Sequence, residues 1–154
     1  MVERLTQEEI RWLLVSLRKI DFFATASLFN IDKIVSLFSK FEFKKGDKII
    51  NEGDSGLALY VIKTGFCQVY KSKGFFGKEK IAELKEGDFF GEMSLIFDAP
   101  ASATVKCLSP VQVYAYMRSD FIKFLAENRE FEKDIQHIAE RRKFEISILD
   151  GKRK

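Results

Sequence analysis

The most informative segment of the chain, residues 87–105, reads GDFFGEMSLIFDAPASATV. It interrupts the regular alternation of apolar and polar residues on either side with glycines, a carboxylate and a run of small side chains. A short helix beginning near Gly91 would present unpaired backbone N–H groups at its positive end, and a glycine lets an anion approach the backbone closely. The segment therefore predicts a small-molecule site inside a β-rich region.

Short β-rich runs separated by turn residues surround this segment. The turns carry Gly-Asp at 46–47, 53–54 and 87–88, and further glycines follow at other turns. Many short strands with regular turns favour a sandwich or a jelly-roll barrel. We expect strands at residues 41–44, 48–51, 57–63, 66–71, 79–84, 101–108 and 111–117.

Helical patterns flank the β-rich region on both sides. Thr6 and Glu9 form a capping box before one helix, and Asn30 is a plausible cap for a second. Ser119 is a plausible cap for a third helix, and residues 129–149 form a longer amphipathic one.

These patterns predict one mainly β domain, an antiparallel, jelly-roll-like β-roll with N-terminal helices and a C-terminal helix pair. We divide it into an N-terminal helical segment (1–40), the β-roll (41–118) and the C-terminal helices (119–150).

The composition is that of an ordinary globular protein of 154 residues, the usual length of one domain. Its 26 basic and 23 acidic residues leave a net charge of only +3, which indicates neither nucleic acid nor an anionic membrane as a partner. No apolar run approaches the roughly 18 residues of a membrane helix, and the acid at Glu3 is atypical of a signal peptide. We therefore expect a cytoplasmic protein with no membrane partner.

Several chemistries lack the residues that they need. His137 is the single histidine, so a histidine-based metal site or catalytic triad is not expected. Cys67 and Cys107 are too few for a disulfide framework and are interpreted as reduced core thiols, with redox sensing as a remote alternative. We expect no catalytic residues, no metal and no cofactor.

The segment 87–105 resembles the phosphate-binding cassette of the cyclic nucleotide-binding domain family. The matching features are Gly91-Glu92, then small residues and Thr104 after Pro100. Three upstream stretches also follow the family pattern: Lys45-Gly46-Asp47, Ile50-x-Glu52-Gly53-Asp54 and Leu59-Tyr60-Val61-Ile62-x-x-Gly65.

The resemblance implies a regulatory, ligand-sensing module rather than an enzyme, with cyclic AMP or cyclic GMP as the ligand. Glu92 would accept a hydrogen bond from a ribose hydroxyl, and the backbone at Ser94 and Ser102 would face the phosphate. The residues implied to bind the ligand are Gly91, Glu92, Met93, Ser94, Ala101, Ser102 and Ala103.

Ala101 departs from the family pattern. Ligand-binding members have an arginine here that pairs with the cyclic phosphate, and alanine supplies neither charge nor donor. No arginine occurs between Arg18 and Arg118, and Lys106 would face the other side of a regular strand. We therefore expect weak or atypical binding of cyclic nucleotides. A nucleoside or other neutral ligand in the same pocket, or a ligand-free interaction scaffold, are the alternatives.

Two further segments have two interpretations each. The resemblance implies that the helix over 129–149 closes over the base of the ligand and can pair with its twin in a homodimer; the alternative is that it only packs on its own domain. Phe75 and Phe76, on a predicted hairpin loop among lysines, could form a docking spot or fold back onto the core. Because so few residues follow the last helix, we expect no nucleic-acid binding by this chain alone.

Overall fold

The computed structural model describes residues 4–24 and 26–152, and the side chains of these residues except Phe22 and those from 142 onward. The helices are α1 (Gln7–Leu17), α2 (Asp21–Ala24), α3 (Leu28–Ser36), α4 (Met93–Ile96), α5 (Arg118–Glu127) and α6 (Arg129–Lys152). The strands are β1 (Ser39–Phe43), β2 (Lys48–Ile50), β3 (Ala58–Thr64), β4 (Cys67–Lys73), β5 (Gly77–Leu84), β6 (Phe89–Phe90), β7 (Thr104–Cys107) and β8 (Val111–Met117).

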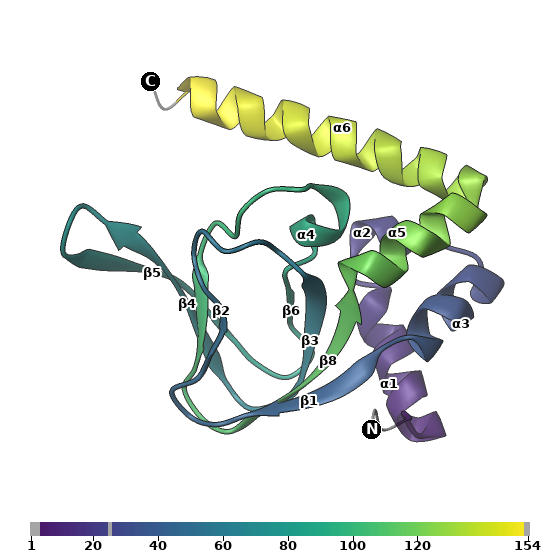
Figure 1. Cartoon of the computed structure of the whole chain (residues 1–154), viewed down its shortest axis with the longest axis horizontal. Coiled ribbons are helices and arrows are strands. Elements are labelled where there is room, and N and C mark those ends of the chain that lie inside the picture. The colour runs from purple at the N-terminus through teal and green to yellow at the C-terminus, as the bar shows by residue number, and fades with distance from the viewer. Residues whose placement is uncertain (1–3, 25, 153–154) are drawn as a thin grey trace.

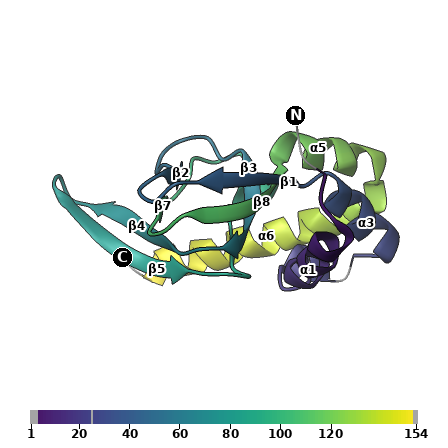
Figure 2. The same cartoon turned by 90° about the horizontal axis from the view of Figure 1, so that it is seen from below.

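The strands form two four-stranded antiparallel sheets that fold around a shared interior (Figure 1). One sheet has the order β1-β8-β3-β6 and the other β2-β7-β4-β5. Helices α1, α3 and α5 gather at one end of this roll, and α6 starts at that end and runs back along the roll, as the view from below shows (Figure 2). The predicted fold class, an antiparallel β-roll with helices on both sides of it in sequence, is confirmed.

Strands β3 and β8 are buried on both faces. Ile62 and Val113 point into the roll, where they join a cluster of buried apolar residues with Cys67. Their neighbours Val61 and Tyr114 point the other way, into a second cluster made with the helices. Since successive side chains of a strand alternate between faces, this one pair of strands supports two hydrophobic cores.

The helical core joins the two ends of the chain. Phe121 of α5 packs edge-on against Tyr116 of β8, with ring centroids 6.0 Å apart, and against Phe131 of α6 at 6.4 Å. Phe23 of α2 also packs edge-on against Phe121 at 6.1 Å. Aromatic pairs of this geometry stabilise beyond the area they bury.

Two helix starts and the start of β7 differ from their predictions, and neither helix α2 nor strand β6 was predicted. Helix α3 is capped by Ser27, whose Oγ accepts a hydrogen bond from the Asn30 amide, so the prediction of Asn30 as the cap was wrong. Helix α5 begins at Arg118, which places Ser119 inside its first turn. Strand β7 begins only at Thr104, because the backbone of Ala101 pairs outside the ladder.

Cys67 and Cys107 are directly paired across β4 and β7. Both are buried and both are free thiols, as predicted. Burial raises the pKa of Cys67 to about 12, with a further contribution from the adjacent Cys107. The two thiols therefore stay protonated and act as small apolar core residues.

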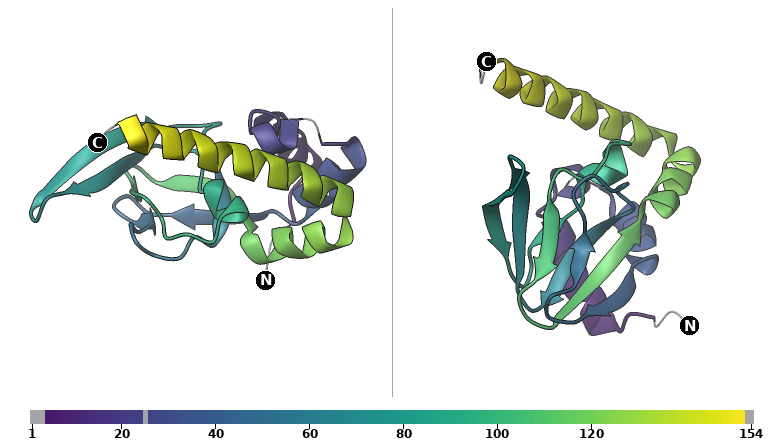
Figure 3. Two further views of the ribbon diagram at one scale, coloured as in Figure 1. Left: turned by 90° about the horizontal axis from the view of Figure 1, so that it is seen from above. Right: turned by 60° about the vertical axis from the view of Figure 1, so that its left-hand side comes forward.

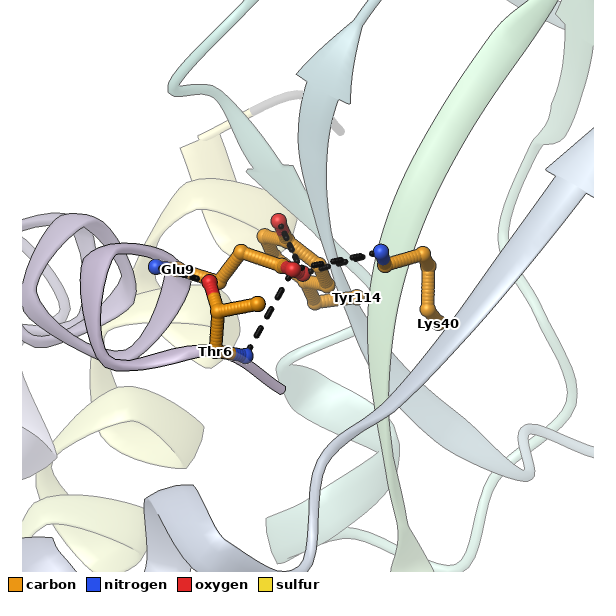
Figure 4. Close-up of polar contacts among 4 residues, drawn as sticks. All are labelled: Thr6, Glu9, Lys40 and Tyr114. Carbon is orange, nitrogen blue, oxygen red and sulfur yellow. Dashed lines mark hydrogen bonds and ion pairs between the residues drawn. The ribbon is translucent and has the colours of Figure 1, made fainter. Parts of the chain in front are cut away.

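Glu9 attaches helix α1 to the roll (Figure 4). Its carboxylate accepts a hydrogen bond from the Tyr114 hydroxyl at 2.9 Å and forms an ion pair with Lys40 at 3.1 Å. The same side chain completes the predicted capping box with Thr6. Desolvation would raise the pKa of Glu9, but the hydrogen bonds from Tyr114, Lys40 and Thr6 outweigh it and lower the pKa.

The substitution Glu9→Gln should destabilise the fold at pH 7 by about 1 kcal/mol or more, since it removes charge-assisted hydrogen bonds. Because folding lowers the pKa of Glu9, this contribution exists above the ordinary value of 4.5 and is lost as the pH falls through the folded-state pKa. Urea unfolding should therefore show a gap between wild type and variant that narrows from neutral to acidic pH. The exposed neighbour Glu8 supplies the control, Glu8→Gln; a Glu9→Gln gap unchanged by pH would contradict this account.

Candidate functional site

A cavity of about 700 Å³ lies at the segment singled out from the sequence. All seven residues predicted to bind a ligand line it, so the fold brings the two halves of the segment together. The lining residues are Ile50, Val69, Phe90, Gly91, Glu92, Met93, Ser94, Ile96, Phe97, Asp98, Ala99, Pro100, Ala101, Ser102, Ala103 and Val105.

Gly91 places the start of the cassette directly against β3. Its φ of +80° is one that side-chain-bearing residues rarely adopt, and a Cβ there would lie 2.5 Å from the carbonyl oxygen of Ala58. Both conformation and space therefore require glycine at this position.

Helix α4 separates the cavity from the helical core. It begins at Met93, with Glu92 at its N-cap, close to the predicted start near Gly91. Met93 and Ile96 line the cavity, whereas Leu95 is buried among the helices. Any ligand that moves α4 would therefore move a residue of the helical core.

The Ser94 side chain is seated against Gly56. A Cβ on Gly56 would come within 1.9 Å of Ser94 Oγ, so a glycine is needed where this loop meets α4. Gly56 was not predicted to be part of the site, because in the sequence it is only one of several glycines at turns.

The far wall of the cavity is held by the turn before β3. The Ala101 amide donates to the Asp54 carbonyl at 2.8 Å, and the Gly53 amide donates to the Ala101 carbonyl at 2.8 Å. The Glu52 amide donates to Thr104 Oγ1 at 3.0 Å. We call these three bonds the 52–104 clamp; its residues appeared in the motif stretches, but their pairing was not predicted.

A model of the family described as "Cyclic nucleotide-binding domain" matches residues 40–128, more than half of the chain. The chain belongs to the cyclic nucleotide-binding domain family. The resemblance inferred from the cassette is thereby confirmed, and regulatory proteins recur among the relatives.

A cAMP-dependent protein kinase regulatory subunit from Candida albicans is 38% identical over 109 residues, which cover 71% of this chain and 23% of the relative. The solved structure described as "cAMP bound PfPKA-R (141-441)" is 31% identical, with a TM-score of 0.75 over 86% of this chain and 49% of that one. A regulatory subunit of a cAMP-independent protein kinase A from Trypanosoma cruzi, bound to guanosine, shares the fold at 23% identity and a TM-score of 0.64, covering 76% and 41% of the two chains. This chain spans about a quarter of the length of the curated relatives.

The cyclic nucleotide-binding cassette of this chain carries negative rather than positive side chains. Its described lining includes the carboxylates of Glu92 and Asp98 and no lysine, arginine or histidine. Ala101 contributes only a methyl group. Lys106 does not line the cavity, because Val105 does and successive strand residues face opposite ways. The prediction that Lys106 faces away assumed that Ala101 and Lys106 lie on one regular strand. That assumption was wrong, since Ala101 lies outside β7, but Lys106 is indeed not part of the cavity lining.

The nearest arginine before the cassette in sequence is engaged elsewhere. The Arg18 guanidinium donates to the carbonyls of Phe23, Ala24 and Ala26, at 3.0, 3.2 and 2.7 Å. It therefore stabilises the connection between α2 and α3 and contributes no charge to the cavity. Among the residues that the structure describes, no cluster of His, Cys, Asp and Glu could hold a metal ion.

Helix α6 runs along the cassette side of the roll and packs on α4 and α5 (Figures 1 and 3). Ile135 is buried in the helical core, and Ile138 packs against it. The side chains from 142 onward, which include residues 142–149 of the helix predicted to form a homodimer, lie outside the described residues. Within the described chain, no helix is both long and apolar enough to cross a membrane.

The substitution Gly91→Ala should destabilise the domain more than Gly46→Ala. Both glycines have positive φ, which costs other residues about 1–2 kcal/mol, but a Cβ on Gly46 meets nothing within 4 Å. Only Gly91→Ala also collides with the carbonyl of Ala58. Urea unfolding of both variants measures the difference, and equal losses would show that the cassette is not seated on β3 as described.

Proposed function

We propose that this chain is a regulatory sensor domain, not an enzyme, that binds cyclic AMP and cyclic GMP weakly and takes a neutral nucleoside in preference. The observation that carries this proposal is the charge of the cavity: two carboxylates and no cation among its described side chains. A cyclic phosphate bound there would lie near these carboxylates, and the described lining offers it no lysine, arginine or histidine to pair with.

The size and chemistry of the cavity suit a nucleoside. A volume of about 700 Å³ lies within the range of small-molecule sites. Ile50, Val69 and Val105 offer an apolar wall for a base, and Glu92 offers an acceptor for sugar hydroxyls. The Ser102 hydroxyl adds a donor.

The missing arginine has an energetic consequence that separates the two ligand classes. A charge-assisted hydrogen bond contributes about 1.5–3 kcal/mol, which corresponds to roughly tenfold to more than a hundredfold in affinity. A neutral nucleoside has no phosphate and loses nothing by the absence of that bond. The guanosine-bound regulatory subunit from Trypanosoma cruzi is an example of this fold with a nucleoside ligand.

The output would pass through α4. A ligand that binds one position of α4 better than another shifts Leu95 within the core that it shares with Phe131 and Ile135. Helices α5 and α6 would then move relative to the roll. The identity of the relatives as kinase regulatory subunits supports a regulatory output, carried by a longer protein or a partner.

Isothermal titration calorimetry of wild type and Ala101→Arg with cyclic AMP, cyclic GMP, adenosine and guanosine tests this proposal. We expect the wild type to bind a nucleoside more tightly than either cyclic nucleotide. Ala101→Arg should bind cyclic nucleotides at least about tenfold more tightly, because it restores a cation for the phosphate. Ala126→Arg, at an exposed position of α5, adds the same charge away from the cavity. It should change the affinity neither for cyclic nucleotides nor for nucleosides.

Tight binding of cyclic AMP by the wild type, unimproved by Ala101→Arg, would overturn the preference for a neutral ligand. A wild type that binds none of the four ligands, together with an Ala101→Arg variant that binds cyclic AMP, would favour the interaction scaffold instead.

A further inference from the structure

The hairpin of β4 and β5 ends in two uncovered aromatic rings. Phe75 is 98% exposed and Phe76 is fully exposed, so neither folds back onto the core. The turn is made with Gly74, whose φ is +65°. The hairpin tip lies at the end of the molecule opposite α1, α3 and α5, while the C-terminal part of α6 runs toward the same end (Figures 1 and 2). Two adjacent and almost fully exposed phenylalanines form an apolar tip, and contiguous exposed apolar patches of this kind mark interaction surfaces.

Four lysines surround this tip on both faces of the hairpin. Ser72 is paired with Lys78 and Lys71 with Glu79. Alternation along the strands therefore places Lys71 and Lys73 on one face, and Lys78 and Lys80 on the other. We call Lys71, Lys73, Lys78 and Lys80 the lysine collar.

The lysine collar concentrates positive charge at the hairpin tip, although the net charge of the whole chain is small. Residues 71–80 contain four lysines and one glutamate, a net charge of +3, equal to that of the whole chain. Lys80 is paired with Glu83, and Lys78 Nζ lies over the Tyr70 ring at 4.7 Å. The expectation of no anionic membrane partner followed from the net charge of the whole chain and did not consider this local concentration of lysines.

We propose that the β4–β5 tip inserts into the surface of an anionic lipid bilayer, independently of any ligand in the cavity. The two rings would enter the interfacial layer, and the lysine collar would contact acidic headgroups. Lysines on both faces of the hairpin favour a bilayer over a protein surface, because lipid headgroups would surround the inserted hairpin tip on every side. A protein surface that received the tip would match charge on the one face that it covers.

Sedimentation with phosphatidylcholine vesicles, with and without phosphatidylserine, tests the proposal on the whole chain. We expect binding only to the vesicles that contain phosphatidylserine, and weaker binding at high salt. Phe75→Ser with Phe76→Ser should weaken it at least about tenfold. Phe66→Ser removes another exposed ring, 58% exposed beside the β3–β4 turn, and should bind as the wild type does.

A matched pair of charge variants separates the lysine collar from net charge. Lys73→Glu with Lys78→Glu and Lys44→Glu with Lys45→Glu change the total charge equally, but the second pair lies in the exposed turn between β1 and β2. Only the first pair should abolish binding. Phe76→Trp should show a blue shift of its emission with anionic vesicles alone, which tests insertion without disturbing the collar.

Three results would overturn the proposal. The first is a wild type that does not bind anionic vesicles. The tip would then be expected to bind in an apolar pocket of another protein instead. The second is equal loss of binding in both pairs of charge variants. The third is vesicle binding that survives the loss of both phenylalanines.

Discussion

The burial of β3 and β8 on both faces is the constraint on which the rest of the structure depends. Ile62 and Val113 close the roll, while Val61 and Tyr114 receive the helices on the opposite face. A strand that serves two cores cannot shift register without exposing both sets of side chains. Gly91 then fixes the cassette to this rigid base, since its backbone lies against Ala58 of β3.

This arrangement gives the cavity one wall that is fixed by hydrogen bonds and one wall, α4, that is packed against the helical core. The 52–104 clamp ties the far wall to the turn before β3 through two backbone hydrogen bonds of Ala101 and one bond to the Thr104 hydroxyl. None of the three depends on the side chain at Ala101. The near wall is α4, which shares Leu95 with the helical core. Under the proposed function, the alanine at position 101 changes what the cavity binds without removing the connection to α5 and α6.

Features that depend on neighbouring residues in the sequence were predicted well. Features that depend on pairing between distant segments were not predicted. The Thr6–Glu9 capping box and the strand at 111–117 depend on neighbouring residues, and both were found. The two-residue strand β6 exists only because it pairs with β3, so its sequence carries no sign of it. The site residues followed from one continuous motif, whereas Gly56 and the clamp at Ala101 required contacts between distant segments.

The central claim is that the cavity selects against a phosphate because its described lining carries two carboxylates and no lysine, arginine or histidine. Titration of the ¹⁵N-labelled chain with adenosine and, separately, with cyclic AMP, followed by amide NMR spectra, tests this most directly. The account predicts that adenosine shifts the amides of Gly91, Glu92 and Ala103 at lower concentrations than cyclic AMP does. Saturation of the same amides by cyclic AMP at lower concentrations than by adenosine would contradict it.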